Sequence, residues 1–228
     1  MATFEEQLRV NALYRYPEHS IAYGYLSSFT YPWEALDGLS EFIRICGATL
    51  SPDEYDHPAE NIWIAKSASV APTAHLGGPL IVCDGAEIRH CAFIRGSAIV
   101  GANAVVGNST ELKNCILFDN VQVPHFNYVG DAILGYRSHM GAGSVTSNVK
   151  SDKTPVVIRY GKETIETGRK KCGAMLGDFV EVGCNSVLNP GTVIGCHSNV
   201  YPLSSVRGFV PEQHIFKSRE EVIIKRDR

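Results

Sequence analysis

An aliphatic residue recurs at every sixth position from Ile64 to Leu112, without exception. An amphipathic helix needs an apolar residue every three or four positions and a half-buried strand needs one at every second position, so a period of six fits neither. It indicates short straight segments separated by turns, three of which close a triangular coil of 18 residues. Stacked coils bury one continuous core, so we predict an all-β fold, a parallel β-helix of hexapeptide repeats. The anchors of this run are Ile64, Val70, Leu76, Val82, Ile88, Ile94, Val100, Val106 and Leu112.

The repeat continues to Val206 with two kinds of interruption. The steps from Leu112 to Leu117 and from Val129 to Leu134 are five residues long, and we interpret such slips as turns that bulge. The pattern is absent between residues 147 and 171, where alternating residues around Tyr160-Gly161 predict a hairpin. Because six-residue spacing returns afterwards, this segment is an insertion between coils.

The first 58 residues lack the repeat, and we expect a small helical region there. Thr3 and Glu6 fit a capping box at the start of a helix from Phe4 to about Leu13, and apolar spacing predicts another from Pro32 to about Cys46. The aromatic side chains of this region are expected to cover the open end of a sheet or, alternatively, to meet a neighbouring subunit. The predicted division is a helical N-terminal cap at 1–58, a β-helix at 59–210 with its loop insertion at 147–171, and a C-terminal tail at 211–228.

Charge and composition argue against several classes of partner. The net charge is −3, and the longest basic block is Arg169-Lys170-Lys171, so we expect neither nucleic acid nor a membrane surface as a partner. No apolar run is long enough for a signal or a membrane span, which predicts a soluble, cytoplasmic protein. The seven cysteines form no CxxC pair and are expected to be reduced and mostly buried. Flat stacked faces predict a homotrimer.

The segment Val123–Asn148 contains more polar residues than its regular aliphatic anchors require. These residues are His125, Tyr128, Asp131, His139 and Asn148.

Three motifs in and after this segment give the chain a specific resemblance. PHFNYVGDAILG, MGAGSVTSN and GRKKCGAMLGDFVEVG make residues 80–208 resemble the left-handed β-helix acyltransferases. The motifs are most similar to the acetyltransferase domain of the bifunctional N-acetylglucosamine-1-phosphate uridylyltransferase/glucosamine-1-phosphate acetyltransferases and to their archaeal sugar-1-phosphate nucleotidylyltransferase relatives. The resemblance implies a left-handed helix and a coenzyme A-dependent acyltransferase, with acetyl-CoA as co-substrate and an amino-sugar 1-phosphate as acceptor. No nucleotidylyltransferase domain is expected, because residues before 60 contain no Gly-rich nucleotide-binding segment.

The resemblance also assigns roles to individual residues. It implies that His125 is the general base and that Arg95 and Lys113 hold the sugar phosphate. Where the family has an asparagine that contacts the sugar, this chain has His139. The resemblance also implies Tyr128, Asn148 and Lys153 at the substrate site. We further expect Ala142 and Cys184 to contact the coenzyme.

The residues themselves fit this chemistry. An imidazole such as that of His125 accepts a proton near neutral pH, and Asp131 or a backbone carbonyl is expected to fix its tautomer. Gly141 and Gly143 allow close approach of the backbone, so the N–H of Ala142 is a candidate oxyanion donor. Because 18 residues separate Arg95 from Lys113, we expect the two cations on one face, one coil apart.

Two other functions remain open from sequence. A non-catalytic trimer that binds a sugar phosphate or a nucleotide sugar would share most of these features. A metal-dependent enzyme like the γ-carbonic anhydrases is disfavoured, because His90, His125 and His139 lack the close histidine pair of that family. We therefore expect no metal ligands.

Overall fold

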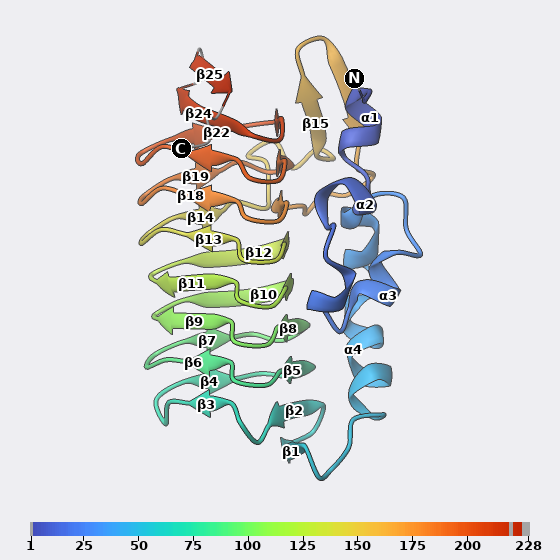
Figure 1. Cartoon of the computed structure of the whole chain (residues 1–228), viewed down its shortest axis with the longest axis vertical. Coiled ribbons are helices and arrows are strands. Elements are labelled where there is room, and N and C mark those ends of the chain that lie inside the picture. Colours follow the sequence, from blue (N-terminus) through green and yellow to red (C-terminus); the bar gives the residue numbers. More distant parts are fainter. Residues whose placement is uncertain (1, 219–220, 225–228) are drawn as a thin grey trace.

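The computed structural model describes residues 2–218 and 221–224. A tall stack of short parallel strands forms one side of the molecule, and the N-terminal helices lie along the other side (Figure 1). The fold is the predicted all-β, left-handed parallel β-helix with a small helical region and an inserted hairpin. None of the helices in the described residues is long and apolar enough to cross a membrane.

Each coil contributes one segment to each of three faces, which we number in chain order. Face 1 consists of β2 (Ile62–Ala65), β5 (Leu80–Val82), β8 (Ala98–Val100), the second halves of β10 (Glu111–Leu117) and β12 (Tyr128–Leu134), β17 (Ala174–Leu176), β20 (Thr192–Ile194) and β23 (Phe209–Val210). Face 2 consists of β3 (Ser69–Val70), β6 (Glu87–Ile88), β9 (Val105–Asn108), β11 (Gln122–His125), β13 (His139–Met140), β18 (Glu181–Val182), β21 (Asn199–Val200) and β24 (His214–Ser218). Face 3 consists of β4 (His75–Leu76), β7 (Phe93–Ile94), the first halves of β10 and β12, β14 (Val145–Thr146), β19 (Val187–Leu188) and β22 (Ser205–Val206).

Three antiparallel pairings add to the stack. β1 (Tyr55–Ala59) pairs with β2 at the first coil. β25 (Glu221–Ile224) pairs with β24, which itself extends face 2 beyond residue 210 by pairing in parallel with β21. The predicted hairpin around Tyr160-Gly161 is confirmed as β15 (Val157–Tyr160) and β16 (Glu163–Glu166).

The hexad anchors form the interior of the helix. From Val82 to Val206 the anchor side chains are buried, whereas the first three, Ile64, Val70 and Leu76, are only partly buried. Anchors of successive coils pair directly, for example Ile94 with Leu112 and Leu112 with Val129. Each anchor therefore packs on its counterparts in the coils above and below.

The two five-residue steps are tightened corners, so the expectation of bulging turns was wrong. β10 and β12 run on from face 3 into face 1 as single strands, each turning at one residue with a left-handed backbone, Asn114 (φ +49°) and Asp131 (φ +49°). Because both corners are one residue shorter, the side chains of Asn114 and Asp131 lie directly above one another in successive coils.

From β5 to β20 the outward side of face 1 is apolar and covered. The residue in the middle of each strand points away from the helix interior, yet Ile81, Ile99, Ile116, Ile133 and Val193 have no exposed surface. The N-terminal segment packs on this side, with α4 contacting β5, β8 and β10 and η2 contacting β12. The expectation that this segment caps the open end of a sheet was therefore wrong, because it covers a face along its length (Figure 1).

Both predicted N-terminal helices are shorter than expected and broken. The capping box of Thr3 and Glu6 is confirmed, with Glu6 N donating to Thr3 Oγ1 at 3.2 Å and Thr3 N to Glu6 Oε2 at 2.8 Å. The helical elements are α1 (Phe4–Gln7), α2 (Val10–Leu13), η1 (Pro17–His19), α3 (Tyr23–Leu26), η2 (Pro32–Leu36) and α4 (Leu39–Gly47).

Asp178 fastens the N-terminal segment to the helix. This carboxylate is fully buried and accepts hydrogen bonds from Arg15 N at 2.6 Å and from Tyr136 N at 2.8 Å, while its own N–H donates to Leu13 O at 3.1 Å. Burial raises the pKa of Asp178 to about 6, although the two N–H donors favour the charged form. One side chain thus joins two parts of the chain that are far apart in sequence.

We predict that Asp178→Asn lowers the free energy of unfolding by about 1–3 kcal/mol, because an amide leaves one of the two buried N–H groups without an acceptor. The raised pKa means that folded Asp178 binds a proton more readily than the unfolded chain does. Its contribution is therefore most favourable near pH 4, declines until about pH 6 and is constant above.

Urea unfolding at pH 4.5 and pH 7 measures both effects. The deficit of Asp178→Asn should be larger at the lower pH, and the exposed control Asp56→Asn should show no such trend. A deficit that grows with pH would contradict the assignment.

Candidate active site

The edge between faces 2 and 3 aligns three of the residues singled out from sequence. His125 ends β11, and Ala142 and Cys184 lie in the corresponding turns of the next two coils, since Gly143 N donates to His125 O at 3.0 Å and Asn185 N donates to Ala142 O at 2.8 Å. His125 and Cys184 are exposed and Ala142 is half-buried. The candidate base and both candidate coenzyme contacts therefore lie along one accessible edge.

A buried asparagine fixes the backbone of this edge. Asn127 is 3% exposed, and its Nδ2 donates to Gly141 O at 2.9 Å and to Ser144 O at 3.1 Å. Its Oδ1 accepts from His125 N at 3.1 Å. Asn127 thus ties the His125 turn to the next turn of the stack. The sequence carried a signal for it, since Asn127 stands four residues after an anchor, where earlier hexads mostly have alanine.

The two glycines beside Ala142 are required by packing. A Cβ at Gly141 would lie 2.7 Å from Cys184 N, and one at Gly143 would lie 2.2 Å from Asn185 Oδ1. Gly143 also has a positive φ of +73°. Within residues 2–218 and 221–224 the N–H of Ala142 donates to no acceptor, so it stays available to a ligand.

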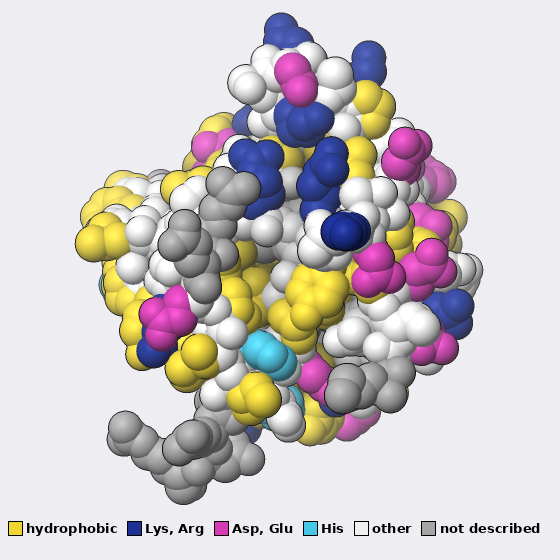
Figure 2. Space-filling model, turned by 90° about the horizontal axis from the view of Figure 1, so that it is seen from above, with side chains coloured by type: hydrophobic (Ala, Val, Ile, Leu, Met, Phe, Trp, Pro, Cys, Tyr) yellow, Lys and Arg dark blue, Asp and Glu magenta, His cyan; other side chains and the backbone are white. Residues whose placement is uncertain are grey.

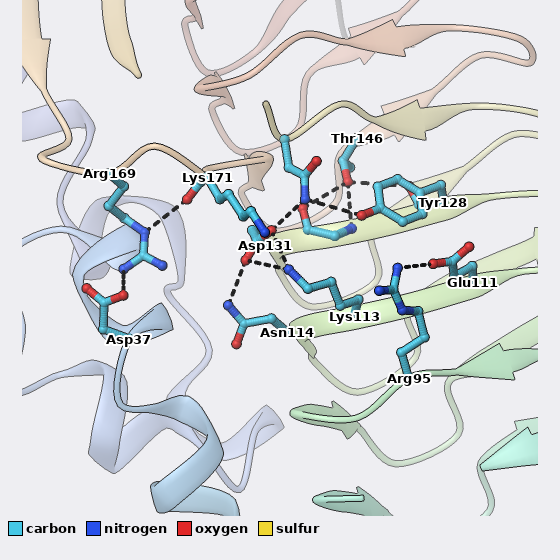
Figure 3. A network of polar contacts seen from close by, with 12 residues as sticks. Asp37, Arg95, Glu111, Lys113, Asn114, Tyr128, Asp131, Thr146, Arg169 and Lys171 are labelled. Atoms are coloured by element: carbon cyan, nitrogen blue, oxygen red, sulfur yellow. Dashed lines mark hydrogen bonds and ion pairs between the residues drawn. The ribbon is translucent and has the colours of Figure 1, made fainter. Parts of the chain in front are cut away.

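Face 3, which adjoins this edge, carries a network of polar side chains centred on Asp131 (Figure 3). Asp131 is 2% exposed and accepts hydrogen bonds from Lys113 Nζ at 3.1 Å, Asn114 Nδ2 at 2.8 Å and Asn148 Nδ2 at 2.5 Å. Three donors compensate the cost of burying the charge. The carboxylate in turn holds the lysine and one amide against the face.

Tyr128 lies beside this network. Its hydroxyl accepts from Asn148 Nδ2 at 3.2 Å, and its ring lies over Gly130, where a Cβ would come within 2.3 Å of the hydroxyl oxygen. Burial raises the pKa of the Tyr128 hydroxyl, and the nearby carboxylates Asp131 and Glu111 raise it further. The hydroxyl therefore keeps its proton at neutral pH and can donate it to a ligand.

Arg95 and Lys113 are neighbours in adjacent coils, as predicted, because Ile94 pairs with Leu112. Each cation has its own carboxylate. Arg95 Nη1 lies 2.8 Å from Glu111 Oε1, and Lys113 Nζ lies 3.1 Å from Asp131 Oδ2 (Figure 3). The sequence indicated the two cations and gave no indication of Glu111.

Two of the expected site residues lie elsewhere. His139 is on face 2 above Gln122, and its Nδ1 lies 2.8 Å from Glu181 Oε2. Lys153 is an exposed residue of the insertion. Within one chain, neither joins the group formed by His125, Tyr128 and Lys113.

Asp131 does not fix the tautomer of His125. Its oxygens bind Lys113, Asn114 and Asn148 at the edge between faces 3 and 1, whereas His125 lies at the edge between faces 2 and 3. The five-residue steps were the signal for this role, since they place Asp131 and Asn114 at equivalent corners in successive coils.

The insertion begins and ends beside this network. Cys172 N donates to Asn148 O at 3.0 Å and Gly173 N donates to Asp131 O at 2.8 Å, so the base of the insertion closes directly over the Asp131 corner. Arg169 in the insertion forms an ion pair with Asp37 of the N-terminal segment at 2.6 Å (Figure 3). The insertion and the N-terminal segment therefore support the Asp131 network from the side of face 1.

Residues 2–218 and 221–224 contain no group of three or more His, Cys, Asp or Glu side chains arranged to hold a metal ion.

Known proteins similar to this chain include sugar-modifying enzymes. The solved structure of the polysialic acid-specific acetyltransferase NeuO is 13% identical, covers 70% of this chain and 80% of its own, and has a TM-score of 0.44. The bifunctional protein GlmU of Methanococcus maripaludis is 30% identical over 206 residues, which is 89% of this chain and 50% of that protein. A bifunctional sugar-1-phosphate nucleotidylyltransferase/acetyltransferase of Sulfurisphaera tokodaii is 30% identical over 126 residues, 55% of this chain and 31% of that protein.

The predicted resemblance is confirmed by these relatives, although the chain spans only about half the length of the GlmU protein it matches. The model of one protein family, described as the GMPPB C-terminal domain, matches residues 76–200. Since this match covers more than half of the 228 residues, the chain belongs to the GMPPB C-terminal domain family.

Proposed function

We propose that this protein is a coenzyme A-dependent acyltransferase that transfers an acetyl group to the amine of an amino-sugar 1-phosphate. The observation that supports the proposal is that the edge with His125 adjoins face 3 with its polar side chains. An exposed histidine stands on an edge with an available backbone N–H, and the adjoining face presents Lys113, Tyr128 and Asn148. The names of the curated relatives support the same reaction class.

His125 is the general base of this reaction. Its ring is exposed and has no hydrogen-bond partner within the described ranges, so a nitrogen is free for the acceptor amine. His125 takes the proton that the amine loses as its nitrogen bonds to the thioester carbonyl carbon. It then returns this proton to the sulfur as the carbon–sulfur bond breaks. The N–H of Ala142 donates to the carbonyl oxygen while that oxygen carries negative charge.

The acceptor binds on face 3 and the coenzyme along the edge. Tyr128 follows His125 by three residues around the corner, so a sugar held by Tyr128, Asn148 and Lys113 has its reactive end beside the base. Ala142 and Cys184 continue the edge towards the later coils, which gives the coenzyme an exposed track. Lys153 and His139 reach this site only if the insertion or a second copy supplies them.

The state of assembly in this proposal is a homotrimer. Helices cover face 1, which leaves the other two faces and their common edge for contacts between copies. That edge exposes large apolar side chains, with Phe126 62% exposed and Leu203 80% exposed. Such residues usually mark contact surfaces when they gather along one feature.

We predict that His125→Ala lowers kcat for acetyl transfer from acetyl-CoA to glucosamine 1-phosphate by about 10²- to 10⁴-fold with little change in KM, because only proton transfer is lost. A thiol-release assay with glucosamine 1-phosphate and galactosamine 1-phosphate measures this. The matched control is His90→Ala, since His90 stands on the same edge two coils earlier. Normal turnover by His125→Ala would remove the base assignment.

Calorimetry on the unmodified protein distinguishes the proposed enzyme from a non-catalytic binding protein. We expect heat of binding with coenzyme A and, separately, with N-acetylglucosamine 1-phosphate. Binding of the sugar phosphate or of a nucleotide sugar without any binding of coenzyme A would favour the non-catalytic trimer instead.

We predict that the double substitution Phe126→Glu/Leu203→Glu converts the trimer to monomer, because it places charges in the proposed contact. Light scattering coupled to gel filtration measures the mass. Ile45→Glu is the control, since Ile45 is 60% exposed on α4, away from this edge. An unchanged mass in the double variant would exclude the edge as the contact.

A further inference from the structure

The inner side of the edge that carries His125 is lined by one column of side chains, and the chemistry of this inner column changes along the stack. It consists of the residue four positions after each face 2 anchor. Alanine occupies it in the first two coils, and since Ala92 is 1% exposed, alanine is enough to fill this corner. From the coil before His125 onwards the column has hydroxyl or amide side chains, all of them buried. In chain order the inner column is Ala74, Ala92, Thr110, Asn127, Ser144, Ser186 and Ser204.

The polar members of the inner column bind the backbone of the edge. Burial of a polar group without a partner is costly, so these side chains need hydrogen bonds inside the helix. Thr110 Oγ1 donates to Val123 O at 3.0 Å, and Ser186 Oγ donates to Tyr201 O at 3.1 Å. Each of these two hydroxyls thus binds the following coil just before its turn at the edge. Such bonds restrain the turns in a way that alanine cannot.

Asn127 is the one amide of the inner column, and it binds more of the backbone than the hydroxyls do. Its Oδ1 accepts from His125 N at 3.1 Å, while its Nδ2 donates to Gly141 O at 2.9 Å and to Ser144 O at 3.1 Å. The two carbonyl groups lie on either side of Ala142 in the chain. One side chain therefore joins the backbone of the proposed base to both ends of the turn that carries the candidate oxyanion donor.

This turn needs support because glycines flank Ala142 on both sides. Packing against the next coil requires Gly141 and Gly143, and glycine allows the backbone many conformations. The amide bonds of Asn127 restrict the turn at both of its ends. The base and the oxyanion donor must act on the same carbonyl group, and a misplacement of about 1 Å can lower a rate by roughly 10²-fold.

We infer that Asn127 is a positioning residue for acetyl transfer, which holds the Ala142 N–H at the distance from His125 that the reaction needs. The inference rests on the proposed function and adds a structural requirement to it. Asn127 is 3% exposed and lies inside the helix, so it touches neither substrate. It acts on kcat through the two turns and leaves the binding of both substrates unchanged.

The kinetic test is Asn127→Ser, because the same column already contains serine at Ser144 and Ser186 and the variant is therefore expected to fold. It should lower kcat with acetyl-CoA and glucosamine 1-phosphate about 10- to 100-fold, while KM for each substrate stays within about twofold. Its kcat should rise with pH over the same range as in the unmodified protein but reach a lower plateau, since His125 is still the base.

The matched control is Ser186→Ala, which removes a buried hydroxyl from the same column two coils later. Its kcat should stay within about twofold of the unmodified value. A general loss of stability along the column would instead lower kcat in both variants.

Amide hydrogen exchange measures the restraint itself, without turnover. The N–H groups of Gly141, Gly143 and Ser144 are hydrogen-bonded in the structure. In Asn127→Ser they should exchange about tenfold faster or more, because the turn opens more often. In Ser186→Ala their exchange should be unchanged.

Three results would overturn the inference and leave the proposed function intact. They are a normal kcat in Asn127→Ser, a lower kcat with unchanged exchange at residues 141–144, and an equal loss of kcat in Ser186→Ala. If the unmodified protein transfers no acetyl group to glucosamine 1-phosphate or galactosamine 1-phosphate, the proposed function fails, and this inference fails with it.

Discussion

Parallel stacking at one strand spacing is the constraint on which the rest of this structure depends. Through most of the stack a residue lies directly above the one that precedes it by 17 or 18 positions, as the pairs Ile94–Leu112 and Leu112–Val129 show. Residues that are distant in sequence thereby become neighbours without any further folding step. The edge with His125 and the face with Lys113 are both columns of this kind.

The interior of the helix could be predicted from sequence because inward side chains repeat with a simple period. The covering of face 1 was missed, although the residues for it were visible. Ile81, Ile99, Ile116 and Ile133 occupy positions that should face solvent, and a second apolar stripe requires a second layer. The period of six explains inward residues only, so this outward stripe needed a separate search.

The candidate site was predicted in part. Stacking was enough to bring Arg95 beside Lys113, whereas the partners of these cations depend on side-chain reach and on the backbone at the corners. Asp131 is the clearest case, because its left-handed corner turns it towards Lys113 and Asn148 and away from His125. The five-residue steps mark the corner in the sequence, but they do not specify which partners the side chain meets there. His139 shows a second limit of prediction from sequence. It is close in sequence to the site residues, yet it lies on face 2 and not on face 3.

The path of the N-terminal segment has a consequence for the order in which the molecule is completed during synthesis. α1 lies against the last coils, where Phe4 contacts Phe209, and its ring also contacts Tyr160 of the inserted hairpin, whereas α4 lies against the early strand β5 (Figure 1). Figure 2 views the molecule from above, at the end where α1 and this hairpin lie. A solenoid normally grows by adding each new coil to the previous one. Here α1 precedes all the coils in the chain, yet its partner Phe209 lies in β23, so α1 can dock only after the later coils have formed, whereas α4 can cover β5 and β8 as soon as those strands exist.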